Sequence, residues 1–336
     1  MTLSSDDRTR RIQLALITPP GHPVTGLLVD RLGTGETLLL AMDPDATVPL
    51  GLPGNWFAAW RQQVRQPSGT HEITDALDAC ERLDLDVIAP GDPMWPTGLD
   101  DLGSSAPLVL FSRGDARLLT RPLHAKVAVV GSRAATQYGE NVAQQTAADL
   151  ADAGYTIVSG GAYGIDAAAH RGALTAPAGT VAVLASGLGR YYPAGNTDLL
   201  TRITQTGAVV TEAPPGTTLS RARLLQRNRI VAATSGATVV VEAAYRSGSL
   251  DTVQRAHDLH RTVAAFPGPV TSAASSGTHR VIAAGLARLV TTADEVRGLI
   301  EAGRRTSPSV DRQTALHDFT APTSRTTSRR PPDLTR

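Results

Sequence analysis

The regular alternation of apolar runs and helical segments after Lys126 is the feature that most constrains the fold. The runs are uninterrupted, as strands of a parallel sheet covered on both faces must be. They read "KVAVVG", "YTIVSG", "TVAVLASG", "AVVTEAPPG", "ATVVVEA" and "TVAAFPG". Segments with helical periodicity, such as "QYGENVAQQTAADLADAG", separate them. We therefore predict an α/β fold with a doubly wound, mostly parallel, Rossmann-like sheet over residues 123–303.

The rest of the chain predicts three further parts. Residues 1–70 are punctuated by Pro and Gly and predict a small helical domain. Residues 71–122 predict one helix and two short strands around a Pro-rich loop, a lead-in segment packed on the core. Residues 304–336 are rich in Ser, Thr, Pro and Arg and lack apolar periodicity. We expect this tail to be disordered.

The composition indicates a soluble globular protein. With 41% hydrophobic residues the chain can bury a sizeable core, and no apolar run reaches the ~18 residues that span a bilayer. Cys80 is the single cysteine, which excludes an intramolecular disulfide and suits a reducing compartment. The N-terminus has no apolar region typical of a signal peptide. We expect a cytoplasmic location and no membrane partner.

Gly, Ser and Arg residues follow almost every predicted strand. Ligands of open parallel sheets bind at the carboxyl ends of the strands. Glycines let an anion approach backbone N–H groups at a helix N-terminus, and Arg offers a fork for phosphate oxygens. Tight turns also use Gly for geometry alone, but several such corners at one edge favour phosphate binding. The candidate residues are Ser132, Arg133, Ser159, Gly160, Gly161, Gly164, Arg246, Ser247 and Gly248.

The segment "RARLLQRNRI" adds a concentration of positive charge to these corners. Its four arginines and one asparagine are Arg221, Arg223, Arg227, Asn228 and Arg229. At helical spacing Arg223 and Arg227 share one face. Such a run is often only a solvated face. Beside the glycine corners, however, it indicates a basic groove of the kind that follows the backbone of single-stranded nucleic acid.

Other ligands and chemistries have no matching motif. The first corner is not GxGxxG and the chain has no GxxxxGK[ST], so neither a dinucleotide site nor P-loop ATP hydrolysis is expected. No HExxH or CxxC spacing occurs, and we predict no metal and no cofactor. His170 fits either a general base or a packing residue, and Asp166 fits stabilisation of a helix N-terminus. Because neither has an identifiable partner, we predict no catalytic residue.

Motifs along residues 70–300 resemble one protein family. They read "VAVVGSR", "VSGGAYGIDAAAH", "AVLASGLGRYYP", "TEAPPG", "QRNRIVAATS", "VVVEAAYRSGSL" and "FPGPVTSAASSG". Their order and spacing resemble the DNA-processing protein A family, also called Smf. The N-terminus resembles that family's sterile-alpha-motif-like or helix-hairpin-helix-like domain. Many members end in a winged-helix domain, for which residues 301–336 are too short and too polar.

The resemblance implies a function and a site. Members bind single-stranded DNA entering during natural transformation, protect it and load the RecA recombinase onto it. They act as dimers and are not known as enzymes. By motif, the corner 159–164 would form a backbone cradle, and residues 227–229 would line the DNA groove. Residues 132–133 would lie at the phosphate end of the first strand, and residues 246–248 at the far corner of the groove.

The chain departs from the family pattern in its aromatic residues. Many members have Phe-Pro before the Arg-Asn-Arg element, where this chain has Leu224 and Leu225. Aromatic residues make up 4% of the chain, so there are few candidates for base stacking. They are Tyr163, Tyr191 and Tyr245.

Two other functions stay open on such a fold. Lysine-decarboxylase-like phosphoribohydrolases share this kind of sheet and carry PGGxGTxxE, where this chain has "YRSGSLDT". A nucleotide-sensing module would bind a small phosphate ligand and signal to a partner. Release of free base from nucleotides would identify the first, and tight mononucleotide binding without affinity for a single strand would identify the second.

Overall fold

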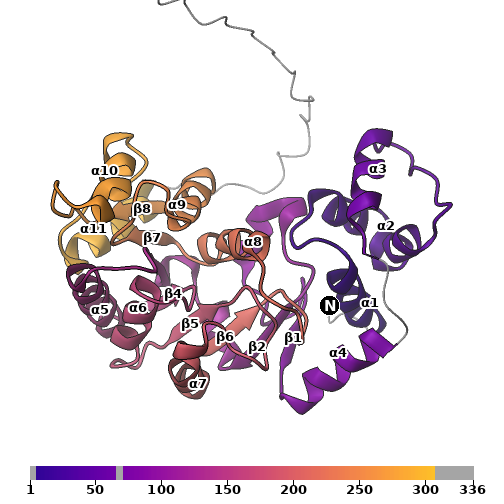
Figure 1. The fold of residues 1–336 in the computed structure, drawn as a ribbon, viewed down its shortest axis with the longest axis horizontal. Helices are drawn as coiled ribbons and strands as arrows, with labels where there is room; N and C mark the ends of the chain where they lie inside the picture. Colours follow the sequence, from indigo (N-terminus) through magenta and orange to yellow (C-terminus); the bar gives the residue numbers. More distant parts are fainter. Residues whose placement is uncertain (1–4, 66–70, 307–336) are drawn as a thin grey trace, which may run out of the picture.

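The computed structural model describes residues 5–65 and 71–306, in which the strands form one nine-stranded sheet (Figure 1). The strand order is β1-β2-β6-β5-β4-β3-β7-β8-β9. The strands from β3 to β9 pair in parallel, which confirms the predicted doubly wound, mostly parallel sheet. Their bounds are β1 Asp86–Ile88, β2 Leu110–Gly114, β3 Lys126–Val130, β4 Thr156–Ser159, β5 Thr180–Val183, β6 Ala208–Thr211, β7 Ala237–Val240, β8 Thr262–Ala265 and β9 Arg288–Leu289.

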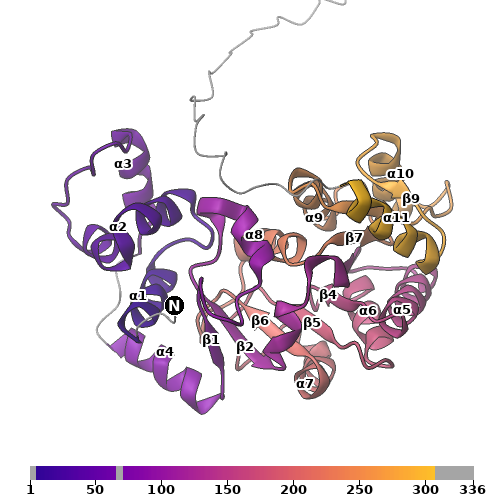
Figure 2. The same cartoon turned by 180° about the vertical axis from the view of Figure 1, so that it is seen from behind.

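Helices cover both faces of the sheet (Figures 1 and 2). Successive residues of a strand point to opposite faces. Ala128 and Val130 of β3 therefore pack with α8, α9 and α10, whereas Val127 and Val129 pack with α5, α6 and α11. The bounds of the helices in this domain are α5 Gln137–Asp152, α6 Ile165–Ala173, α7 Thr197–Thr206, α8 Arg221–Ala233, α9 Ser249–Asp258, α10 Ser276–Ala283 and α11 Ala293–Thr306.

The lead-in segment extends the sheet at one edge. β2 pairs antiparallel with β6, and β1 pairs antiparallel with β2. The sequence predicted both strands but not their place in the sheet. Phe111 of β2 is fully buried, and it shares a hydrophobic cluster with Ile12 of α1 and Cys80 of α4 (His71–Arg82). Because this cluster includes both N-terminal parts, the domain boundaries at residues 70 and 122 stay a prediction.

Three helices form the N-terminal part, at the opposite end of the molecule from α10 and α11 (Figures 1 and 2). They are α1 Ser5–Ile17, α2 Pro23–Met42 and α3 Gly54–Gln63. Their own core includes Leu28, Phe57 and Trp60, and the Trp60 indole N–H donates to Thr25 Oγ1 at 2.8 Å. Small helical domains with one such core are marginally stable alone, so contact with the sheet matters to them.

The C-terminal helix is longer than predicted. We expected it to end at Gly303, but α11 continues to Thr306, three residues into the segment predicted to be disordered. Glycine is permitted inside a helix at a modest cost in free energy. The residue type that follows Gly303 is arginine, which is a good helix former. The rest of that predicted tail, residues 307–336, lies outside the described residues. Across the described ranges, no helix is long and apolar enough to cross a membrane.

Lys126, the only lysine of the chain, is buried at the start of β3. Its Nζ donates to the Leu119 carbonyl oxygen at 2.5 Å. Burial lowers the pKa of Lys126 to about 8, and the positive charges of Arg121 and Arg261 act in the same direction. The folded protein therefore holds this proton less tightly than the unfolded chain, in which a lysine pKa is about 10.4.

We expect the free energy of unfolding to rise from about pH 8 to about pH 10, because the unfolded state binds the extra proton there. The rise should be about 1 kcal/mol per pH unit, and Lys126→Met should remove most of it. Urea unfolding of both proteins across this range measures it. Cys80, whose pKa burial raises to about 11, opposes the rise above about pH 9 in both proteins alike. Equal pH slopes would contradict the assignment to Lys126.

Candidate nucleic-acid interface

A cleft of about 770 Å³ opens at the carboxyl edge of the parallel sheet. It lies where β3 has β4 on one side and β7 on the other, which is the point at which the strand order reverses. Open α/β sheets bind ligands at such a point because the loops diverge to either side. The predicted site residues that line it are Ser132, Arg133, Gly160, Arg227, Asn228, Arg246, Ser247 and Gly248.

The guanidinium of Arg227 reaches from α8 into this cleft. The residue is 7% exposed, and its Nη1 donates to the Val183 carbonyl oxygen at 2.8 Å. The group lies directly against the backbone of Gly160, where a Cβ atom would be 1.8 Å from Nη1. Arg227 Nε has no hydrogen-bond partner among the described residues. A largely buried cation therefore lines the cleft.

The Asp166 carboxylate lies close enough to offset part of this charge. Asp166 is 6% exposed in the first turn of α6 and accepts a hydrogen bond from the Ala162 N–H at 3.3 Å. Burial raises the pKa of Asp166, while the charges of Arg227 and Arg133 act in the opposite direction. Burial likewise lowers the pKa of Arg227, and Asp166 acts against that effect. The two buried charges stabilise each other.

The helix that follows β3 already holds a carboxylate of the chain itself at its N-terminus. Glu242, at the end of β7, accepts hydrogen bonds from the Thr136 N–H at 2.7 Å and from Thr136 Oγ1 at 2.8 Å. Thr136 is the N-cap of α5, so Glu242 occupies the position at which a dinucleotide fold binds pyrophosphate. The Asp166 carboxylate instead accepts from the Ala162 N–H in the loop before α6. The main positive charges of the cleft are the guanidinium groups that line it.

Three members of the predicted backbone cradle lie beneath the cleft and do not line it. Ser159 is fully buried, and its hydroxyl donates to the Val129 carbonyl oxygen at 2.6 Å. Gly164 has a φ of +70°, and a Cβ there would be 2.4 Å from the Ser132 carbonyl oxygen. Gly161 packs against leucine side chains. The phosphate cradle stays a prediction, and close packing of the strand corners accounts for these three residues.

Exposed arginines from separate elements surround the cleft. Arg133, Arg221 and Arg246 line it, and within the described ranges none of their side chains makes a hydrogen bond or an ion pair. The cleft also contains Asp251, whose carboxylate accepts from Arg255 Nε at 2.8 Å. Sequence reasoning missed Asp251, because an acidic residue in the first turn of a helix is common and indicates no ligand. The positive charges of the cleft remain in excess.

Arg229 serves a structural contact away from the cleft. It is 1% exposed, and its Nη1 and Nη2 donate to the Glu212 carboxylate at 2.7 and 2.6 Å. Its Nε donates to the Ser105 carbonyl oxygen at 2.8 Å. Residues two positions apart on an α-helix are rotated by about 200° around its axis. The side chains of Arg227 and Arg229 therefore cannot point the same way. We therefore leave Arg229 out of the groove that the sequence predicted.

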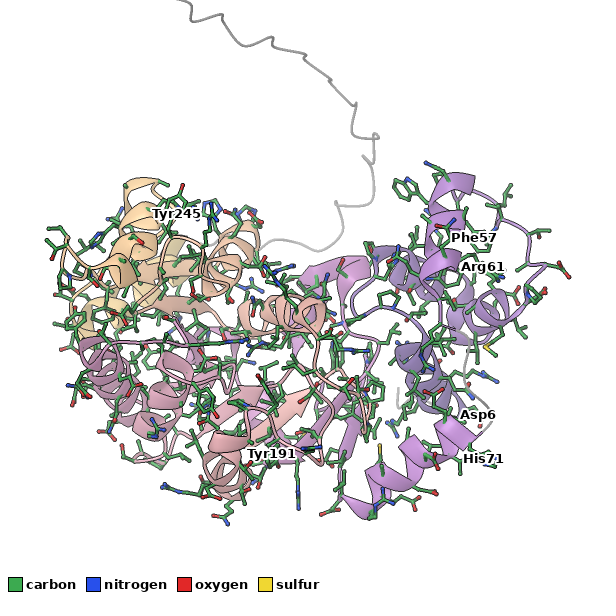
Figure 3. The ribbon with its side chains drawn as sticks, in the orientation of Figure 1. Asp6, Phe57, Arg61, His71, Tyr191 and Tyr245 are labelled. Atoms are coloured by element: carbon green, nitrogen blue, oxygen red, sulfur yellow. The ribbon has the colours of Figure 1, made fainter. Side chains whose placement is uncertain are left out.

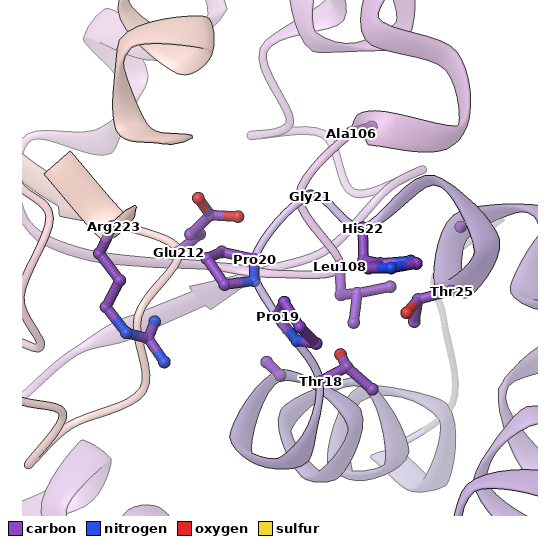
Figure 4. A pocket seen from close by; sticks show the side chains of 12 residues that line it. Thr18, Pro19, Pro20, Gly21, His22, Thr25, Ala106, Leu108, Glu212 and Arg223 are labelled. Carbon is purple, nitrogen blue, oxygen red and sulfur yellow. The ribbon is translucent and has the colours of Figure 1, made fainter. Parts of the chain in front are cut away.

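Arg223 points toward the N-terminal helices (Figure 4). It lines a small pocket that also includes Glu212 and the turn from Thr18 to His22. Burial lowers the pKa of Arg223, and the charge of Glu212 acts against this effect. Helical spacing predicted a shared face for Arg223 and Arg227. In the structure the two lie one turn apart and line different pockets.

The acidic residues that line the cleft are Asp166 and Asp251. Among the described residues that line it there is no histidine or cysteine. His170 is fully buried, its Nδ1 lies 2.8 Å from Thr180 Oγ1, and burial lowers its pKa to about 3. It is thus a neutral packing residue. No cluster of three potential metal ligands occurs in residues 5–65 and 71–306.

The sequence model of the family described as DNA recombination-mediator protein A matches residues 86–301. The chain belongs to this family. A relative named putative DNA processing protein DprA, from Mycobacterium tuberculosis, is 50% identical over 232 residues. The matched region covers 66% of this chain and 59% of that relative. DNA processing protein DprA of Streptococcus pneumoniae is 39% identical over 205 residues, which are 61% of this chain and 71% of the relative.

Solved structures of family members have the same fold. The X-ray structure of DprA from S. pneumoniae superposes with a TM-score of 0.68 at 29% identity, over 89% of this chain and 98% of that one. A Helicobacter pylori structure, described as showing a unique single-stranded DNA binding mode, gives 0.58 at 28% identity, over 65% and 96%. These matches confirm both the predicted family and the Rossmann-like fold.

The contact of Gly160 with Arg227 predicts a sharp difference between two glycines of the cleft. Gly160→Ala should lower the free energy of unfolding by about 1–3 kcal/mol, because the methyl group overlaps the buried guanidinium. Gly248→Ala is the matched control, since a Cβ there meets open space. Urea unfolding of the two variants compares them, and equal losses would contradict the close contact.

The buried pair of Arg229 and Glu212 predicts a stability effect rather than a binding effect. Arg229→Ala should cost about 3–5 kcal/mol of unfolding free energy, since it leaves a buried carboxylate unpaired. Adding Glu212→Ala should recover part of this loss because the unpaired charge is then gone. Thermal and urea unfolding measure both variants. If the double variant were no more stable than the single one, the paired carboxylate would not be the cause.

Proposed function

We propose that the protein binds single-stranded DNA in the cleft at the carboxyl edge of the sheet. The observation that carries the proposal is the cluster of guanidinium groups at the cleft: Arg227 lines it, and the exposed arginines around it form no ion pair within the described residues. Guanidinium groups bind phosphate oxygens through paired hydrogen bonds. The H. pylori family member, whose description names single-stranded DNA, supports the same ligand.

The distribution of the charges favours a strand over a mononucleotide. Arg133 follows β3, Arg221 begins α8, and Arg246 follows β7, so their charges come from separate elements around one cleft. A single phosphate group is bound best by converging donors at a free helix N-terminus. Here Glu242 takes that position on α5, the helix that follows β3. A chain of phosphates fits the dispersed arginines better, which disfavours the nucleotide-sensor alternative.

The depth of the site favours a single strand over a duplex. Arg227 is 93% buried, so only a backbone that bends into the cleft can bring a phosphate to it. A single strand can bend in this way, whereas a short DNA duplex behaves as a stiff rod. The cleft also lacks a free acid–base pair, and relatives are named DNA processing proteins. We therefore propose binding without catalysis, rather than phosphoribohydrolase activity.

The wider role follows the family. We propose that the protein protects single-stranded DNA and promotes loading of the RecA recombinase onto it. We further propose that it acts as a homodimer in the cytoplasm, in recombination and in natural transformation. The description of the family as recombination mediators supports this role. The chain spans 59% of the length of the M. tuberculosis relative, so these activities are proposals for this chain.

The test is fluorescence anisotropy with a labelled single strand of about 30 nucleotides and the matching duplex, at several salt concentrations. We expect a preference for the single strand. Arg133→Ala with Arg246→Ala should reduce the log–log salt slope by about 1.4 in total, about 0.7 for each lost phosphate contact. The control is Arg171→Ala, an exposed arginine near the end of α6 that does not line the cleft.

Two results would overturn the proposal. Equal binding to duplex and single strand would remove the preference on which it depends. An unchanged salt slope in the double variant, with the wild type binding normally, would place the DNA elsewhere. Calorimetry with mononucleotides tests the nucleotide-sensor alternative. An assay for release of free base from nucleotides tests the phosphoribohydrolase alternative.

A further inference from the structure

Helix α8 has a second side, which faces away from the cleft. The residues of α8 that line the cleft are Arg221, Leu224, Leu225, Arg227, Asn228 and Val231. Consecutive residues of an α-helix are rotated by about 100° around its axis, so Arg223, Arg229 and Ala233 lie on the opposite side. Arg223 lines the pocket beside the N-terminal turn, and Arg229 donates to the Ser105 carbonyl oxygen. This second side of α8 therefore faces the lead-in segment and the N-terminal helices.

One short helix of the lead-in segment lies between α2 and α8. It is the 3₁₀ helix η1, Thr97–Ser105, and it contacts both of them. A Cβ atom at Gly26 of α2 would overlap the Ser104 carbonyl oxygen of η1. Likewise, a Cβ atom at Gly98 of η1 would overlap the Ala233 carbonyl oxygen of α8. At both contacts backbone packs directly on backbone, with no side chain between them.

Contacts between two backbones transmit a displacement from one element to the next. A long side chain at such a contact could change its rotamer and absorb a small shift. Glycine offers no such adjustment, and close-packed protein interiors are nearly incompressible. A shift of α2 relative to η1 therefore changes the position of η1 on α8. Because α8 carries Arg227, the same shift reaches the cleft.

The N-terminal helices do not line the cleft themselves. The lining residues all come from parts of the chain after residue 65. Figure 3 shows Phe57 and Arg61 of α3 at one end of the molecule. Tyr245, which precedes the cleft residue Arg246, lies toward the other end (Figure 3). An effect of these helices on DNA in the cleft would therefore be transmitted through η1 and α8.

We propose that the N-terminal helices regulate the affinity of the cleft, because they hold α8 in position through η1. Gly26 and Gly98 are the positioning residues of this contact. The inference rests on the proposed binding of single-stranded DNA, and it names the element that regulates that site. Displacement of α2 from η1 should weaken DNA binding. Because coupling between two sites is reciprocal, DNA in the cleft should also stabilise the contact of α2 with η1.

Hydrogen–deuterium exchange of the wild-type protein, with and without a single strand, tests this reciprocity. We expect bound DNA to slow amide exchange in α2 and η1, although α2 does not line the cleft. Two amides report on the contact. The Gly26 N–H donates to the His22 carbonyl oxygen at 3.2 Å, and the Leu99 N–H donates to the Pro96 carbonyl oxygen at 2.9 Å. Slower exchange confined to the loops around the cleft would overturn the coupling.

A substitution in α2 tests the other direction. Gly26→Ala should weaken single-strand binding by between about twofold and about thirtyfold, because the methyl group pushes α2 away from η1. The log–log salt slope should stay unchanged, since no phosphate contact is lost. Gly35→Ala is the matched control in the same helix, where the nearest group to a Cβ atom is the Arg10 guanidinium at 3.6 Å. It should bind like the wild type.

The outcomes separate this coupling from the function on which it rests. Equal affinities of folded Gly26→Ala and Gly35→Ala would overturn the positioning role, while DNA binding stands. A reduced salt slope in Gly26→Ala, or photo-crosslinks from a 5-bromodeoxyuridine strand to α2, would show direct contact with DNA and would also overturn it. If Gly26→Ala does not fold, hydrogen exchange of the wild type decides alone. If the wild type binds no single strand, the proposed function itself fails.

Discussion

The contact between the Arg227 guanidinium and the bare backbone of Gly160 governs the arrangement around the cleft. A side chain at position 160 would occupy the space of the guanidinium. Burying this charge costs free energy unless compensating groups lie nearby. The Val183 carbonyl oxygen accepts one hydrogen bond, and Asp166 supplies a negative charge. The loop after β4, the start of α6 and the middle of α8 are thereby joined.

The three consecutive residues 227–229 of α8 each contact a different part of the molecule. Arg227 reaches the carboxyl edge of β4 and β5. The Asn228 amide donates to the Gly248 carbonyl oxygen at 3.1 Å and to Asp251 at 3.2 Å, which holds the start of α9. Arg229 joins Glu212, at the end of β6, to the lead-in segment. One helical turn thus fixes the positions of the loops on either side of the cleft.

This cleft binds anions by a different principle from the dinucleotide folds that its sheet resembles. There, backbone N–H groups at a free helix N-terminus hold the phosphates. Here, the Glu242 carboxylate occupies the N-terminus of α5, and guanidinium groups line the cleft. Guanidinium groups on several elements can follow an extended polyanion, whereas one helix N-terminus serves a compact group. The same sheet can therefore support either ligand.

The sequence by itself determined the layers, the order of the elements and the strand ends at which a ligand could bind. Continuous apolar strands between amphipathic helices allow few other folds, and the carboxyl ends of parallel strands must meet at one edge. Only the tertiary structure decided which residues reach the cleft. Arg227 and Arg229 are two residues apart with the same chemistry, yet one lines the cleft and the other pairs with Glu212. The sequence also does not distinguish the roles of two glycines, Gly160 and Gly164, which both follow β4. A nearby guanidinium requires the first and a nearby carbonyl oxygen requires the second, and both neighbours come from distant parts of the chain.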